Sequence, residues 1–273
     1  MGLPSSRIRI PDFLAKKAQR RKITMLTAYD ATMARLLDEA GIDVLLVGDS
    51  LGVVILGNET TIPVTMDAMV HHTRAVANGA KRALVIADLP FLSYQASAAD
   101  AVRNAGRLVQ EGGASAVKLE GGLVMAETVQ RLVEIGIPVM GHIGLTPQSV
   151  HQLGGYRMVG KTRSEAESLV QDARALEAAG AFAVVLECIP EEIAAGITAA
   201  LQIPTIGIGS GPYCDGQVLV SYDAFGFFEA APRFVKLYAR MGEEMRAAAR
   251  EYIDDVEQGR FPRRGVSVQN SKR

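Results

Sequence analysis

Short apolar runs recur along most of the chain, and longer segments with apolar positions at helical spacing separate most of them. The runs are continuously apolar instead of alternating, which is typical of parallel strands buried on both faces. About eight strands are predicted in this way. They are Ile23–Ala28, Val44–Val47, Leu84–Ala87, the run inside Gly113–Gly122, Pro138–Ile143, Ala183–Leu186, Thr205–Ile208 and Val218–Ser221.

Helical spacing predicts the elements between these strands, and glycines end several of them. The predicted helices are Pro11–Arg20, Ala31–Ala40, Met66–Asn78, Ala98–Glu111, Val124–Ile135, Ser164–Ala179 with Ser164 as N-cap, Glu191–Leu201 and Pro232–Gln258. The segment Thr146–Thr162 has no strong periodicity, and its length is typical of a lid or binding loop.

Alternating strands and helices over 273 residues predict an α/β fold, a (β/α)8 TIM barrel. Pro11–Arg20 precedes the first strand, so we expect an N-terminal helix that caps the barrel bottom. No linker divides the chain, which predicts a single domain over residues 1–273 with a mobile tail from about 260. A doubly wound open sheet is the alternative, although no Gly-x-Gly-x-x-Gly motif follows the first strand.

Composition narrows the partners that the chain can have. Hydrophobic residues make up 48% and charged residues 22%, with a formal net charge of −1, so there is no basic field for nucleic acid or anionic membrane. No apolar run is long enough to span a bilayer, and residues 1–20 lack a secretory apolar segment. The two cysteines cannot form a disulfide framework, and we expect a cytoplasmic location.

Ionisable residues stand where five successive predicted strands end. They are Asp49, Asp88, Lys118 with Glu120, His142 and Glu187. Lys118 and Glu120 face the same way because strand side chains alternate. One such pair is as easily a structural ion pair as part of a site. In a barrel, however, the carboxyl ends of all strands meet at one mouth, so the whole set predicts a functional site.

Carboxylate oxygens gathered at one point suit a hard cation such as Mg²⁺, which takes few carboxylates and leaves room for substrate oxygens. Cysteines and histidines with zinc-type spacing are absent, which disfavours Zn²⁺. A cation chelated by a 2-oxo acid acidifies the neighbouring C–H and stabilises the enolate, a lysine adds positive charge, and another carboxylate can act as base. The pattern suggests enolate chemistry without naming the substrate.

The glycine-rich segment Gly207–Gly211 follows the seventh predicted strand and has two interpretations. It could cradle a phosphate, as such loops often do in barrels, or form a turn that lets a ligand approach closely. Pro212–Asp215 do not begin an obvious helix, so the turn is favoured. Cys188 follows Glu187 and faces the other way, which indicates packing and not a nucleophile.

Five segments in order carry a resemblance to a known family. They are Met25–Asp30, Val47–Gly52, Asp88–Phe91, Val117–Gly122 and Gly141–Gln148. Together they resemble the ketopantoate hydroxymethyltransferase (3-methyl-2-oxobutanoate hydroxymethyltransferase) family, over about Ile10 to Pro262. The resemblance implies transfer of a one-carbon unit from 5,10-methylenetetrahydrofolate to 3-methyl-2-oxobutanoate, which gives 2-dehydropantoate for pantothenate biosynthesis.

The resemblance also implies the roles of individual residues. Asp49, Asp88 and Glu120 would surround one Mg²⁺ per subunit, and Glu187 matches the family's proton acceptor. The residues implied in binding the 2-oxo acid are Asp49, Ser50, Asp88, Lys118 and His142. The family forms large homo-oligomers, so a homodecamer is expected.

Three positions depart from the family pattern. Leu92 stands where glycine is usual, Asn78 where arginine is usual, and Tyr222 where histidine is common. None of the three is among the residues implied in metal binding or proton transfer. The departures therefore put in doubt details of substrate or folate packing, not the reaction class.

Two other functions are consistent with the residues. A Mg²⁺-dependent lyase or mutase acting on 2-oxo acids or their phosphates would use a similar barrel, but usually with a cysteine in a mobile loop, and neither Cys188 nor Cys214 lies in such a motif. A non-catalytic metabolite-binding barrel is disfavoured because Glu187 and the three metal carboxylates are all present. Dependence on folate discriminates the transferase from the lyase or mutase.

Overall fold

The computed structural model describes residues 6–262, and the chain divides into two compact units, Met1–Val220 and Ser221–Arg273. Each unit is described by itself. The single domain expected over 1–273 stays a prediction, and the tail expected from about 260 lies almost wholly outside the described residues.

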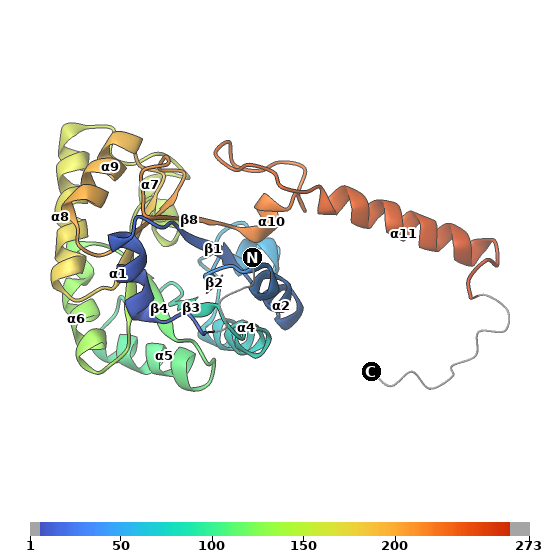
Figure 1. Ribbon diagram of the computed structural model, residues 1–273, viewed down its shortest axis with the longest axis horizontal. Coiled ribbons are helices and arrows are strands. Elements are labelled where there is room, and N and C mark those ends of the chain that lie inside the picture. The colour runs from blue at the N-terminus through green and yellow to red at the C-terminus, as the bar shows by residue number, and fades with distance from the viewer. Residues whose placement is uncertain (1–5, 263–273) are drawn as a thin grey trace. The chain divides into compact units, whose positions relative to one another are not determined.

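The first unit is built on a closed barrel of parallel strands that pair in chain order, with the last strand returning to the first (Figure 1). The strands are β1 (Ile23–Thr27), β2 (Val44–Val47), β3 (Leu84–Asp88), β4 (Ala116–Glu120), β5 (Val139–Gly144), β6 (Ala183–Glu187), β7 (Thr205–Ile208) and β8 (Gly216–Leu219). The predicted (β/α)8 barrel is confirmed, and the open sheet is excluded by the pairing of β1 with β8.

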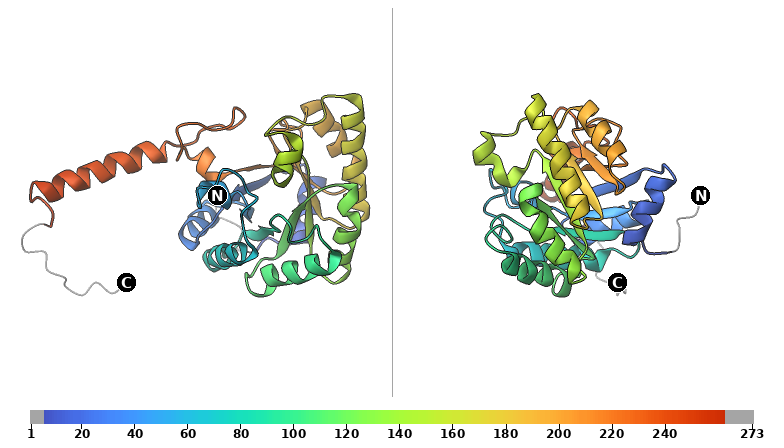
Figure 2. Two further views of the ribbon diagram at one scale, coloured as in Figure 1. Left: turned by 180° about the vertical axis from the view of Figure 1, so that it is seen from behind. Right: turned by 90° about the vertical axis from the view of Figure 1, so that its left-hand side faces the viewer.

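Helices cover the outside of the barrel, and neighbours in sequence pack side by side (Figure 2). They are α2 (Ala31–Ala40), α4 (Met66–Gly79), α5 (Ala98–Gln110), α6 (Ala126–Glu134), α8 (Arg163–Ala178) and α9 (Glu191–Ala200). Short turns of helix lie in the loops, namely α3 (Leu51–Val54), η1 (Leu123–Met125), η2 (Pro147–Ser149) and α7 (Val150–Leu153). A loop, residues 209–215, joins β7 to β8.

Helix α1 (Ile10–Ala18) closes the end of the barrel at which the strands begin. Phe13 is fully buried in the barrel interior, and its ring meets the edge of Phe182 with ring centroids 5.2 Å apart. Burial of such a side chain stabilises the fold by about 2–3 kcal/mol. The predicted helical cap at the barrel bottom is therefore confirmed.

Two of the predicted helix boundaries are wrong. Helix α8 is capped by Thr162, not Ser164, because the Thr162 side chain accepts from Glu165 N while the Glu165 carboxylate accepts from Thr162 N. In the second unit, the helix predicted from Pro232 begins only at Met241, as α11 (Met241–Glu257), after the short α10 (Ser221–Ala224).

The start of α11 has a physical explanation inside the second unit. The backbone N–H groups of Tyr238, Met241 and Gly242 donate to the carbonyls of Ala224, Phe225 and Gly226, respectively. These bonds replace the helical pairing that the sequence pattern favours. Within residues 6–262, no helix is both long and apolar enough to cross a membrane.

Candidate active site

The register of the central strands brings the predicted site residues together at the barrel mouth. Asp88 on β3 stands opposite Lys118 on β4, and Glu120 on β4 stands opposite His142 on β5. Lys118 Nζ lies 3.0 Å from Asp88 Oδ1, and His142 Nδ1 lies 3.6 Å from Glu120 Oε1. All four side chains are buried. The parallel register of these strands thus places both the Asp88–Lys118 pair and the Glu120–His142 pair at the barrel mouth.

The turn after β2 adds Asp49 and Ser50 to this group. Asp49 N donates to Asp88 Oδ2 at 3.0 Å, and the Ser50 hydroxyl lies 2.9 Å from the Tyr29 hydroxyl. A Cβ at position 48 would stand 2.6 Å from Ser50 Oγ, so a larger residue there would displace the Ser50 hydroxyl. Glycine at this position therefore leaves room for the hydroxyl at the mouth.

Glu187, at the end of β6, lies beside His142 and so belongs to the same group of side chains at the mouth. His142 Nε2 lies 3.0 Å from Glu187 Oε2, although the two groups do not meet in good hydrogen-bond geometry. Burial, and then the charge of Lys118, lower the pKa of His142, so the ring is neutral at pH 7. Lys118 Nζ, an obligate donor, lies 3.3 Å from Nδ1. The proton of the neutral ring therefore belongs on Nε2, facing Glu187.

Charge at the mouth is unbalanced among these residues. Among the described residues here, three buried carboxylates, from Asp49, Asp88 and Glu120, and that of the half-buried Glu187 stand against one ammonium, that of Lys118. Burial, followed by the charge of Asp88, raises the pKa of Asp49 to about 7. Burial and then Asp49 raise the pKa of Glu120 well above its ordinary value.

The lysine responds to the same imbalance in the opposite sense. Burial by itself would lower the pKa of Lys118, but the carboxylates of Asp88, Glu120 and Asp49 outweigh it and raise that pKa above its ordinary value. Lys118 therefore carries its charge at any physiological pH. The site is one that a further cation would stabilise.

The donor set fits a hard divalent cation. Asp49, Asp88 and Glu120 offer carboxylate oxygens, and Asp88 Oδ1 is buried without a hydrogen bond despite the nearby lysine. Among the described residues no three His, Cys, Asp or Glu side chains are already arranged as the ligands of one ion. Mg²⁺ commonly uses only one or two protein carboxylates, with waters and substrate oxygens completing its shell. The three-carboxylate set stays a prediction.

The loop after β5 contributes two contacts that the sequence did not reveal. Gln148, in η2, donates from its side chain to Asp49 Oδ2 at 2.8 Å and from its backbone to Glu120 Oε2 at 3.0 Å. Tyr94, from the loop after β3, donates to Gln148 Oε1 at 2.8 Å. Gln148 belongs to the segment that carried the family resemblance, which was the available signal. The segment Thr146–Thr162, predicted to be a lid or binding loop, thus reaches the barrel mouth through Gln148.

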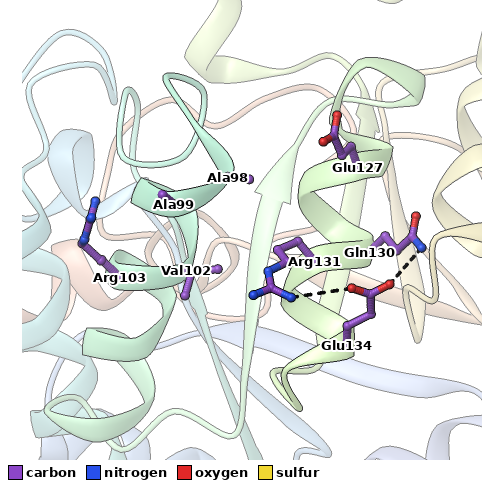
Figure 3. Close-up of a pocket in the computed structure, with 8 residues that line it drawn as sticks. All are labelled: Ala98, Ala99, Val102, Arg103, Glu127, Gln130, Arg131 and Glu134. Atoms are coloured by element: carbon purple, nitrogen blue, oxygen red, sulfur yellow. Dashed lines mark hydrogen bonds and ion pairs between the residues drawn. The ribbon is translucent and has the colours of Figure 1, made fainter.

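A hollow of about 560 Å³ on the outer surface lies apart from these groups, between α5 and α6 (Figure 3). Ala98 and Val102 line its α5 side. On its α6 side, Gln130 and Arg131 each pair with Glu134, and Glu127 also lines the hollow. Nothing in this hollow resembles the buried, unbalanced charge of the mouth, which is therefore the candidate active site.

The fold and the mouth together define a (β/α)8 barrel with an acidic site where its strands end. Solved structures share this fold at low sequence identity. Phosphonopyruvate hydrolase, solved in complex with oxalate and Mg²⁺, aligns with a TM-score of 0.61 at 13% identity, over 97% of this chain and 92% of that one. 2,3-Dimethylmalate lyase, a member of the PEP mutase/isocitrate lyase superfamily, gives 0.60 at 18% identity, over 96% and 91%.

Sequence comparison is more specific than the fold. The model of the ketopantoate hydroxymethyltransferase family matches residues 7–264. The 3-methyl-2-oxobutanoate hydroxymethyltransferase of Moorella thermoacetica is 57% identical over 94% of this chain and 96% of its own length, and that of Syntrophus aciditrophicus is 58% identical over 90% and 91%. The chain belongs to the ketopantoate hydroxymethyltransferase family. Its prediction as an enzyme, a transferase, is confirmed.

Proposed function

We propose that the chain transfers a hydroxymethyl group from 5,10-methylenetetrahydrofolate to 3-methyl-2-oxobutanoate, giving 2-dehydropantoate for pantothenate biosynthesis. Membership of the family supports the hydroxymethyl transfer, since the relatives carry the name of this reaction. The observation that carries the mechanism is the buried mouth, where four carboxylates share one lysine. Such a site suits a reaction in which cations stabilise an enolate.

Binding of the 2-oxo acid falls to the residues around Lys118. Its ammonium, 3.0 Å from Asp88, adds positive charge where the carboxylate and the keto oxygen of the substrate would gather. Ser50, beside the Tyr29 hydroxyl, offers a hydroxyl at the same mouth. A Mg²⁺ ion held by Asp49, Asp88 and Glu120 would supply Lewis-acid polarisation of the keto group.

Proton transfer falls to Glu187, which lies outside the proposed metal ligands. Its carboxylate accepts the proton from C3 of the oxo acid, and the neutral ring of His142 lies 3.0 Å away. Water adds to the methylene carbon of the folate, and its two C–N bonds break to leave tetrahydrofolate and a one-carbon unit at the oxidation level of formaldehyde. The C3 carbon then bonds to that carbon, and its oxygen takes up the proton that Glu187 accepted, which gives the hydroxymethyl group.

A lyase or mutase acting on 2-oxo acids is the second candidate, because solved structures of such enzymes share this fold. That likeness extends only to the fold. Burial, followed by the charge of Glu187, raises the pKa of Cys188 to about 11, which does not suit a reactive thiol. A homodecamer and a cytoplasmic location remain predictions for this chain.

One assay tests the proposed function. Purified protein is incubated with 3-methyl-2-oxobutanoate, with and without 5,10-methylenetetrahydrofolate, and each mixture is divided between Mg²⁺ and EDTA. We expect 2-dehydropantoate only where folate and Mg²⁺ are both present. Consumption of the oxo acid without folate would favour the lyase, and full turnover in EDTA would contradict the metal assignment.

A further inference from the structure

Gln148 uses its whole hydrogen-bonding capacity at the mouth. Its side-chain Nε2 donates to Asp49 Oδ2 at 2.8 Å and to Leu89 O at 2.9 Å. Its Oε1 accepts from Tyr94 Oη at 2.8 Å and from Gln95 Nε2 at 2.9 Å. The Asp49 carboxylate and the Leu89 carbonyl only accept hydrogen bonds, so the amide nitrogen of Gln148 must face them. Only one of the two amide orientations satisfies this. The side chain is buried and held from both ends.

The same residue holds two of the proposed metal carboxylates at once. While the side chain of Gln148 binds Asp49 Oδ2, its backbone N–H donates to Glu120 Oε2 at 3.0 Å. Each carboxylate thus accepts from Gln148 through one oxygen, and the lone pairs that these two bonds do not use remain for a cation. Asp49 lies in the turn after β2 and Glu120 ends β4, so a residue bonded to both constrains their spacing.

Tyr94 supports this arrangement from behind. Its hydroxyl is fully buried, accepts from Glu120 N at 3.0 Å, and donates to Gln148 Oε1, with Glu120 O at 3.1 Å as a second acceptor. The hydroxyl therefore joins the strand that carries Glu120 to the amide that orients Asp49. Connected buried networks of this kind rigidify the groups that they join.

We propose that Gln148 is a positioning residue that fixes the carboxylates of Asp49 and Glu120 for a divalent cation, and that Tyr94 fixes Gln148. The proposal rests on the cation site of the proposed function. Partners that orient metal ligands typically contribute 10-fold to 100-fold, roughly, to metal affinity. The effect is thus expected in cation binding itself, without turnover.

Binding of Mn²⁺ to the full-length chain, followed by the EPR signal of the free ion, gives the readout. Gln148→Met keeps much of the side-chain volume and the backbone N–H but removes both amide donors, so the affinity should fall by about 10-fold to 100-fold. Tyr94→Phe should weaken binding less, and the double variant should bind about as well as Gln148→Met alone. Gln130→Met, on the outer face of α6, is the matched control and should bind like wild type.

Gln148→Glu separates positioning from simple charge. An added carboxylate would strengthen cation binding if only charge mattered, whereas positioning predicts weaker binding because an acceptor would then face Asp49 and Leu89 O. Wild-type protein that fails to bind Mn²⁺ would remove the proposed cation site. Wild-type binding with unchanged affinity in Gln148→Met and Tyr94→Phe, or tighter binding in Gln148→Glu, would overturn the positioning role alone.

Discussion

Buried charges occur at both ends of the barrel, but they are arranged differently. At the end where the strands begin, Asp43 Oδ2 accepts from Lys16 Nζ, from Thr24 N and from Thr24 Oγ1. Asp215 likewise accepts from Lys17 at 2.9 Å and from Thr205 N. Each carboxylate there has a cation and backbone or hydroxyl donors. At the mouth, four carboxylates share Lys118.

Burial does not explain the difference between the two ends, since Asp43 is 7% exposed and Asp49 4% exposed. The supply of cations and hydrogen-bond donors around each carboxylate explains it. A carboxylate with its own cation and donors serves the fold, whereas a group of buried carboxylates without enough cations raises its own pKa values and costs stability. The chain tolerates that cost at the mouth, as is common at binding and catalytic sites. Uncompensated charge is therefore the feature that separates the candidate site from the structural pairs.

The largest effect is expected from removing a carboxylate at the mouth. Asp49→Ala relieves repulsion at the mouth, whereas Asp88→Ala also removes the ion pair of Lys118 and the acceptor of Asp49 N. Both variants should fold, Asp88→Ala with the lower stability, while the affinity for Mg²⁺ and the 2-oxo acid falls by more than about 100-fold. Isothermal titration calorimetry measures both ligands. Unchanged affinities in the two variants would rule out the assigned metal site.

Lys118→Met tests whether the ammonium serves charge or packing. Methionine keeps much of the stem, and Asp88 keeps its hydrogen bond from Asp49 N, so the chain should still fold. Turnover should fall by about 100-fold, the usual cost of losing one group that stabilises a developing anion. Steady-state kinetics and circular dichroism provide the comparison. A fully active variant would mean that the lysine is structural.

The opposite end of the barrel should respond in the opposite way. Asp43→Ala leaves Lys16 without its carboxylate and removes the acceptor of Thr24, so we expect a loss of about 3 kcal/mol in the free energy of unfolding. Urea denaturation measures this loss. Activity per folded molecule should not change, and a selective loss of activity would break the distinction between the two ends.

The smallest effect is expected from a substitution at Leu92. This residue stands where the resemblance to the family implies glycine, and its backbone adopts a φ of +63°, a left-handed conformation that glycine occupies without strain. Its side chain is 63% exposed, so little packing would be lost. Leu92→Gly should stabilise the protein by about 1 kcal/mol, and a matched change in thermal unfolding would show it. Destabilisation would mean that the leucine makes contacts worth more than the strain.

Most of the barrel could be predicted because continuously apolar runs and glycine stops mark its strands and helices directly. The predicted bounds of Val44–Val47, Ala31–Ala40 and Thr205–Ile208 are those observed. The late start of α11 follows from backbone bonds to Ala224, Phe225 and Gly226, which no local pattern shows. The N-cap error at α8 arose because two local patterns compete. Thr162 with Glu165 and Ser164 with Glu167 both fit a capping box, and sequence alone does not choose between them.

The site residues that lie at the ends of strands could be predicted from the sequence. Asp88, Lys118, Glu120, His142 and Glu187 all lie in strands, so alternation and the barrel mouth place them. Gln148 and Tyr94 were not assigned because they come from loops, where no periodicity says which side chain turns inward. Their roles depend on tertiary hydrogen bonds, which the sequence pattern does not contain.

The central claim is that Glu187 removes the C3 proton while the other carboxylates bind. Glu187→Gln keeps the shape of the side chain but cannot accept a proton, and the binding of Mg²⁺ and 3-methyl-2-oxobutanoate should be nearly unchanged. Exchange of the C3 proton with D₂O, followed by NMR in the absence of folate, isolates this one step. Wild type should exchange, and Glu187→Gln should be slower by about 10² to 10⁴. Equal exchange rates in the two proteins, with equal ligand binding, would contradict the assignment and leave His142 or water as the base.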